Sequence, residues 1–193
     1  VWRAFRPDLV PRVLGRPGRE KCPQASGQDH ACGNAPIRRT RPGGKRSIGI
    51  GQKSGNVGGL DPDNEGKVLW SFKAGKGGAL GGIEWGSAAD DTTAYIPVSD
   101  VLTPPNEAGG LSALKLTDGQ PLCHTPAPKL ECNTGRGSSG AQSETVSVVP
   151  GFVFSAPAAG HMRAYSTADG AARRNVTTAL KFHTPNQAAA KPR

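Results

Sequence analysis

The chain has 193 residues, of which 35% are hydrophobic and 5% aromatic, and it contains 27 glycines and 17 prolines. Because glycine and proline both break helices, this composition excludes a helical bundle and predicts a turn-rich, mostly β protein. No stretch approaches the roughly 18 consecutive apolar residues of a transmembrane helix, so none is expected.

The net charge of +9 is concentrated in the first 46 residues. They contain 11 of the 24 lysines and arginines, against three acidic residues, Asp8, Glu20 and Asp29. Residues 47–193 carry 13 basic and 12 acidic residues and are nearly neutral. Any binding of nucleic acid would therefore depend on the N-terminal segment alone, and we expect no nucleic-acid partner.

Residues 1–46 show neither helical nor strand periodicity. They also lack the apolar run of about 7–15 residues that a secretory signal requires. We predict a disordered or artefactual basic leader that packs little against the rest of the chain. One alternative is a basic arm that binds phosphates, for which only Trp2 and Phe5 offer stacking surfaces, and another is a poorly ordered piece of a domain.

Four cysteines are present, Cys22, Cys32, Cys123 and Cys132. Within each pair the spacing is ten or nine residues, whereas zinc sites usually contain pairs with the spacing C-x2-4-C. A zinc site is therefore not expected. A disulfide between the last two cysteines and two unpaired thiols are both compatible with the sequence.

Residues 47–170 contain a repeated pattern, in which a strand leads into a polar turn that closes on glycine and then into a further strand. The closing glycines, Gly66, Gly119 and Gly170, are 53 and 51 residues apart. Glycine suits the left-handed position of a hairpin turn. Further strands are expected upstream, at residues 47–52, 93–99 and 146–155. A period near 50 residues with several short strands per unit predicts consecutive blades of a β-propeller with little helix.

The repeat resembles the blades of pyrroloquinoline quinone-dependent dehydrogenases, whose docking motif runs from an apolar residue and Asp to Gly-Lys-x-x-Trp. Residues 60–70 (LDPDNEGKVLW) match this motif with one extra residue. In that family the Trp packs between blades, so the resemblance implies a scaffold role for Trp70. The second unit has Cys123 at the Trp position, and after Gly170 the third unit has residues 171–174 (AARR) in place of an apolar strand.

Residues 75–90 (GKGGALGGIEWGSAAD) resemble the Gly-Gly-x-x-Trp-Gly-Ser segment of the same enzymes, in which the Trp lies flat under the quinone. The resemblance implies cofactor-binding roles for Trp85, Gly81, Gly82 and Ser87. An indole face can stack on a planar cofactor, and glycines let the backbone approach it closely. Ordinary packing of Trp85 between blades is the alternative.

Residues 95–100 (YIPVSD) match a family strand that ends in an Asn, whose side chain helps to bind calcium. Asp100 stands at that position, so the resemblance implies a metal ligand, with a solvent-exposed strand-end Asp as the alternative. The family's catalytic base is an Asp, but the only acid in residues 124–143 is Glu131. The catalytic residues are therefore not assigned.

The resemblance is to the polyvinyl-alcohol dehydrogenase-like branch of the family, and it covers about residues 48–170. Three units cannot close a ring of the family's eight-blade size, so we expect an all-β fold, a partial propeller of about three blades. The predicted organisation is a disordered basic leader at residues 1–46, the partial propeller at residues 47–180 and a disordered tail at residues 181–193.

The resemblance implies that the whole enzyme oxidises an alcohol, polyvinyl alcohol or another secondary alcohol, with pyrroloquinoline quinone and calcium. It also implies a cytochrome c as electron acceptor and a periplasmic or secreted location. The alternative function is a non-catalytic propeller that serves as a binding or assembly scaffold. Because the quinone pocket of this family draws residues from many blades, we expect the 193-residue chain alone to show no turnover.

Overall fold

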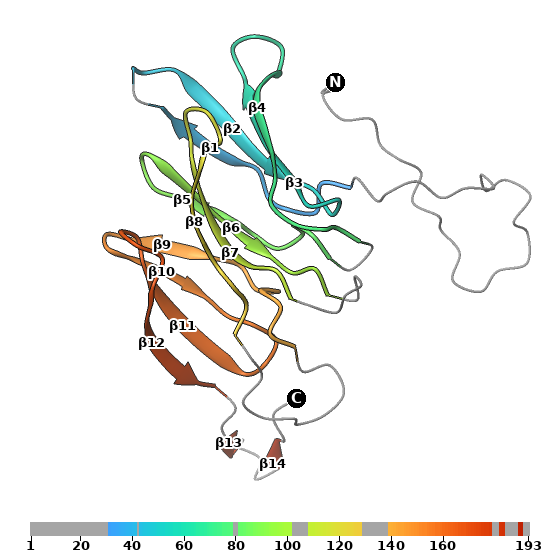
Figure 1. Ribbon diagram of the computed structural model, residues 1–193, viewed down its shortest axis with the longest axis vertical. Coiled ribbons are helices and arrows are strands. Elements are labelled where there is room, and N and C mark those ends of the chain that lie inside the picture. Colours follow the sequence, from blue (N-terminus) through green and yellow to red (C-terminus); the bar gives the residue numbers. More distant parts are fainter. Residues whose placement is uncertain are drawn as a thin grey trace, which may run out of the picture.

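The computed structural model describes residues 31–41, 43–78, 81–101, 108–128, 139–178, 182–183 and 189–190. These residues contain no helix, so nothing in this part of the chain qualifies as a membrane-spanning helix. Their strands form three four-stranded sheets and one two-stranded ribbon. The three larger sheets stack in chain order (Figure 1). This arrangement confirms the predicted partial propeller of about three blades.

Each of the four sheets is formed by strands that are consecutive in the chain. The first contains β1 (Ile37–Thr40), β2 (Arg46–Gly51), β3 (Asn56–Asp61) and β4 (Lys67–Lys73). The second contains β5 (Ala88–Ala89), β6 (Thr93–Val98), β7 (Gly110–Lys115) and β8 (Pro121–Thr125). The third contains β9 (Ser147–Val149), β10 (Phe152–Ser155), β11 (His161–Ser166) and β12 (Ala172–Thr177). The ribbon pairs β13 (Phe182–His183) with β14 (Ala189–Ala190).

The last two strands of each larger sheet are joined by the predicted glycine turn. Gly66, Gly119 and Gly170 have φ angles of 77°, 72° and 70°, in the left-handed region that favours glycine. The strand pair that each turn joins has a register shift at the corresponding place, which in the first sheet lies between Gly59 and Leu60. The shifts in the other two sheets lie between residues 113 and 114 and between residues 164 and 165. The three units therefore repeat in structural detail as well as in sequence.

Neighbouring sheets approach one another at their first strands, because β1 contacts β5 and β5 contacts β9. Arg39 of β1 reaches across to β5, where its Nε donates to the carbonyl oxygen of Ala89 at 3.0 Å. Sheets that meet along one edge and stack face to face are the blades of a propeller, and their converging edges face its central channel. The first strand of each sheet is therefore the innermost.

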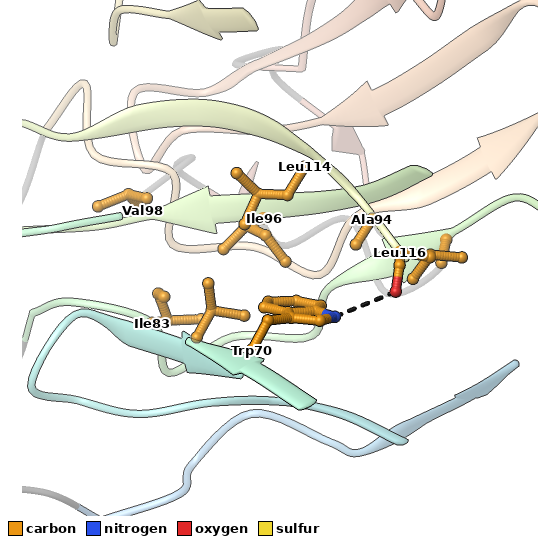
Figure 2. Close-up of a cluster of buried hydrophobic side chains, with 9 residues drawn as sticks. Trp70, Ile83, Ala94, Ile96, Val98, Leu114 and Leu116 are labelled. Atoms are coloured by element: carbon orange, nitrogen blue, oxygen red, sulfur yellow. Dashed lines mark hydrogen bonds between the residues drawn. The ribbon is translucent and has the colours of Figure 1, made fainter. Parts of the chain in front are cut away.

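Two hydrophobic cores fill the spaces between the sheets. The first core consists of Val57, Trp70, Ile83, Ala89, Ala94, Ile96, Val98, Leu114 and Leu116 (Figure 2). The second consists of Tyr95, Leu111, Ala113, Val146, Val153 and Tyr165. Each core draws residues from two adjacent sheets, so burial of apolar surface holds the blades together.

Trp70 docks the first sheet onto the second. Its side chain is 8% exposed, and its indole Nε1 donates to the carbonyl oxygen of Leu116 at 3.0 Å (Figure 2). A Cβ on Gly119 would lie 2.4 Å from Cε3 of Trp70, so the closing glycine of the second sheet makes room for the indole. The predicted scaffold role of Trp70 is confirmed.

Cys123 takes the same place in the next interface. A Cβ on Gly170 would lie 2.8 Å from its Sγ, so the closing glycine of the third sheet faces this thiol. In the third unit Arg174 occupies the corresponding register, opposite Ala164, and all six residues of β12 are exposed. The third unit therefore forms its last strand without the apolar pattern.

The predicted boundary at residue 46 is wrong, because β1 lies inside the segment assigned to the leader. Ile37–Thr40 pairs with β2, and Asn34 is buried. Three of the four residues of β1 are exposed, so the strand carries no apolar alternation that sequence could reveal. The ribbon β13–β14 likewise falls within the predicted tail. Residues 1–30 lie outside the described residues, and the leader prediction for them stays a prediction.

Candidate functional site

The segments that carry the predicted site residues meet at one end of the sheets. Because successive strands alternate in direction, the β2–β3 turn, the β4–β5 connection and the end of β6 all lie at that end. Backbone hydrogen bonds join them. Ile83 donates to the carbonyl oxygen of Gln52 at 3.0 Å, and Val146, before β9, donates to that of Gly86 at 2.8 Å.

The glycine-rich loop, residues 75–78 and 81–82 of the described chain, lies directly against the β2–β3 turn. A Cβ on Gly77 would lie 2.2 Å from the carbonyl oxygen of Ser54, and one on Gly82 would lie 2.1 Å from that of Lys53. Gly81 forms an isolated bridge with Gly78. The close approach that these glycines allow is therefore an approach to the neighbouring turn of the same protein.

Ser87 is held by Asn34, a residue that sequence reasoning missed. The backbone N–H of Ser87 donates to Oδ1 of Asn34 at 3.2 Å, and Nδ2 of Asn34 donates to Oγ of Ser87 at 2.5 Å. Asn34 is 4% exposed. This contact fixes the start of β5 beside β1. No sequence signal could have found it, because Asn34 lies in a segment without periodicity.

Trp85 is 39% exposed and belongs to neither hydrophobic core. It lies between the glycine-rich loop and β5, the innermost strand of the second sheet. Beside it in the sequence, Glu84 forms an ion pair with Lys53, with Oε1 and Nζ 3.1 Å apart. At this exposure, part of the apolar indole surface of Trp85 is left uncovered.

Asp100 is 3% exposed, so the alternative of a solvent-exposed strand-end Asp is wrong. Its carboxylate accepts three backbone hydrogen bonds from the glycine-rich loop. The donors are Lys76 at 2.7 Å, Gly77 at 3.0 Å and Gly82 at 3.1 Å. Sequence reasoning missed this role, since it depends on a loop that meets the end of β6 only in the folded chain.

The surroundings of Asp100 do not fit a calcium site. Calcium takes about 6–8 oxygen ligands, whereas the described residues contain no cluster of three or more His, Cys, Asp or Glu side chains that could hold a metal. At Asp100 the nearest groups are N–H donors, whose positive ends point at the carboxylate.

Buried polar side chains support the same end of the sheets. Gln52 is 1% exposed and accepts a hydrogen bond from Oγ of Ser54 at 3.1 Å. Gln142 is fully buried and accepts one from Oγ of Ser155 at 2.5 Å. Both glutamines lie within residues 48–170, the range of the resemblance. Their burial indicates that they serve the packing of this end of the sheets.

Cys32 and Cys123 are free thiols, whereas Cys22 and Cys132 lie outside the described residues. Of the two alternatives that the sequence left open for Cys123, the structure has the unpaired thiol. Burial raises the pKa of the Cys123 thiol, and the carboxylate of Asp169 adds to this effect. Because the thiolate is the reactive form, Cys123 is a poor nucleophile near neutral pH.

The sequence is 40% identical over 159 residues to a polyvinylalcohol dehydrogenase from a Pseudomonas species, an alignment that covers 82% of this chain and 25% of the relative. The polyvinylalcohol dehydrogenase of Sphingopyxis sp. (strain 113P3) is 40% identical over 164 residues, with 83% and 25% covered. Over most of its own length, the chain is therefore similar in sequence to polyvinylalcohol dehydrogenases. It spans about a quarter of the length of these relatives. No family model matches it.

Among solved structures, the chain is similar to a quinohemoprotein alcohol dehydrogenase from Pseudomonas putida HK5. The TM-score is 0.51 at 9% identity, over 68% of this chain and 25% of the other. At this identity the likeness concerns the fold alone, and it agrees with the stacked sheets. The two sequence alignments, over 82% and 83% of the chain, confirm the resemblance to polyvinyl-alcohol dehydrogenases that was inferred from short motifs.

Proposed function

We propose that the chain is part of an enzyme that oxidises an alcohol, either polyvinyl alcohol or another secondary alcohol, with pyrroloquinoline quinone. The observation that carries the proposal is the exposed indole of Trp85, in the connection between the glycine-rich loop and β5, the innermost strand of the second sheet. The names of two relatives at 40% identity support it. Since the chain spans a quarter of their length, the other walls of the pocket belong to the remainder of the enzyme.

Trp85 offers a flat apolar face against which the quinone stacks. Such a stack contributes about 0.5–1.5 kcal/mol beyond the burial of area. The chemistry that the quinone supplies when bound is acceptance of the hydride that leaves the alcohol carbon. The role of this chain is to hold the planar cofactor in a fixed position and to exclude water from one of its faces.

The general base is assigned to another part of the enzyme. The carboxylate of Asp100 is already used by three N–H donors, and Glu84 is paired with Lys53. Neither group is placed to take the alcohol proton in the described chain. We further propose a cytochrome c as the electron acceptor and a periplasmic or secreted location for the whole enzyme, both from the family resemblance.

A chimaera tests the proposal. Residues 31–178 of this chain replace the matching quarter of the Pseudomonas polyvinylalcohol dehydrogenase, and quinone-dependent dye reduction is measured with polyvinyl alcohol and with a small secondary alcohol. We expect turnover from the chimaera and none from the isolated chain. We expect Trp85→Ala to lower turnover at limiting quinone about tenfold, the factor that 1.4 kcal/mol of binding represents.

Lys45→Gln is the matched control for Trp85→Ala. Lys45 is exposed in the β1–β2 turn, at the opposite end of the sheets, and its substitution should leave turnover unchanged. A chimaera that folds and binds the quinone but oxidises neither alcohol would contradict the proposal. Full activity of the Trp85→Ala chimaera at limiting quinone would remove the indole from the site.

A further inference from the structure

Three backbone N–H groups from the two ends of the glycine-rich loop converge on one carboxylate. Lys76 and Gly77 donate from the start of the loop at 2.7 and 3.0 Å, and Gly82 donates from its end at 3.1 Å. We propose that Asp100 is a positioning residue, whose carboxylate closes this loop and thereby sets the place of Trp85. The inference rests on the proposed function for the use of Trp85, but not for the closure of the loop.

The carboxylate of Asp100 lies directly against Gly75, where a larger residue would leave it too little room. A Cβ on Gly75 would lie 2.9 and 3.1 Å from the two carboxylate oxygens of Asp100 and 2.6 Å from Cγ1 of Val98. Asp100 itself has a φ of 50°, in the left-handed region that residues other than glycine seldom adopt. A conformation of this kind is kept where the surrounding contacts demand it.

The loop joins two sheets through these contacts. On one side Gly78 donates to the carbonyl oxygen of Lys53 at 3.0 Å, which anchors the loop to the β2–β3 turn of the first sheet. On the other side Asp100 and Ser99 hold it to the end of β6, with Ser99 donating to the carbonyl oxygen of Gly82 at 2.9 Å. Trp85 lies three residues after Gly82. The hydrogen bonds that close the loop therefore also fix the position of the Trp85 backbone, from which the indole extends.

The same geometry opposes calcium binding at Asp100. A cation at this carboxylate would compete with three hydrogen bonds and face the positive ends of the N–H dipoles. In the family that the sequence resembles, this position carries an Asn that helps to bind calcium. In this chain, Asp100 at the same position holds the glycine-rich loop. The anionic form of the side chain is the better acceptor for three donors.

Asp100→Asn in the full chain tests the inference, because an amide NH2 cannot accept and at least one donor loses its partner. Asp118→Asn is the matched control, since that carboxylate accepts the N–H of Gln120 at 2.9 Å in an exposed turn, far from the glycine-rich loop in the sequence. Amide exchange is followed by NMR without calcium. We expect the three loop amides to be protected about 100-fold in the wild type and to exchange at least about 10-fold faster in Asp100→Asn only.

A second readout separates positioning from a general loss of structure. In the chain labelled with 5-fluorotryptophan, Asp100→Asn should shift the Trp85 resonance and leave that of Trp70 in place. Unchanged exchange of the loop amides, or equal shifts of both tryptophans, would overturn the inference. Neither readout uses quinone or alcohol, so failure of the proposed function would leave both standing.

The wild-type chain decides the question if Asp100→Asn does not fold. Protected loop amides in the presence of a chelator support closure by the carboxylate. Loop amides that exchange as freely as those of an unfolded chain would contradict it. Protection that appears only when calcium is added would reassign Asp100 to a metal site.

Discussion

Trp70 and Trp85 lie close together in the sequence but in opposite environments. Trp70 is 8% exposed, and its indole N–H donates to the carbonyl oxygen of Leu116. Trp85 is 39% exposed and lies outside both hydrophobic cores. The residue type alone therefore does not assign a role. Burial and the partner of the indole N–H identify Trp70 as the residue that docks a blade, whereas the exposed Trp85 is the residue that we propose stacks on the quinone.

The difference in burial follows from the position of each tryptophan in the fold. Trp70 lies on the last strand of the first sheet and faces the closing glycine of the second, Gly119. Trp85 lies in the connection between sheets, at the end where the glycine-rich loop and the β2–β3 turn meet. A position on a sheet face is covered by the next blade, whereas a position at the end of the sheets is not.

The largest expected effect is that of Trp70→Ala. Removing a buried indole costs about 3–5 kcal/mol of unfolding free energy, because a cavity remains between the sheets. Trp85→Ala makes the same chemical change at an exposed site and should cost less than about 1 kcal/mol. Urea unfolding of both variants, followed by far-UV circular dichroism, measures the difference. Equal losses of stability would contradict the distinction between the two tryptophans.

A smaller effect separates the two docking interfaces. Gly119 and Gly170 have nearly the same φ, 72° and 70°, so alanine at either position carries the same backbone cost of about 1–2 kcal/mol. At Gly119 the new methyl also meets the Trp70 ring, at 2.4 Å, whereas at Gly170 it meets the Cys123 thiol, at 2.8 Å. We expect Gly119→Ala to cost about 1–3 kcal/mol more than Gly170→Ala.

The double variant Trp70→Ala/Gly119→Ala shows where this excess arises. Without the indole, alanine at position 119 should cost no more than alanine at position 170, because only the backbone term remains. An excess that persists in the double variant would show that the indole is not what the closing glycine accommodates.

The features that could be predicted from the sequence are those that depend on local patterns repeated along the chain. The closing glycines and the docking position of Trp70 recur at a fixed period, so the blades could be predicted before the structure. The first strand could not, since three of the four residues of β1 are exposed and its order comes from pairing with β2.

The contacts of the site were not accessible to sequence reasoning. Asn34 and Ser87 are 53 residues apart, and the three donors to Asp100 come from 24, 23 and 18 residues upstream. Such contacts depend on how the blades stack, and no local pattern encodes them. The resemblance singled out Trp85, whose role in cofactor binding stays a prediction, and Asp100, for which it implied a chemistry that the surroundings do not fit.

The role of Trp85 as the surface that receives the quinone is tested most directly by titrating pyrroloquinoline quinone into the chain labelled with 5-fluorotryptophan. One wall of a pocket should bind weakly, with a dissociation constant of about 1 mM, which corresponds to about 4 kcal/mol. We predict that the Trp85 resonance shifts with saturation in this range while the buried Trp70 resonance stays in place. A Trp85 resonance that does not move, or one that moves no more than that of Trp70, would contradict the assignment.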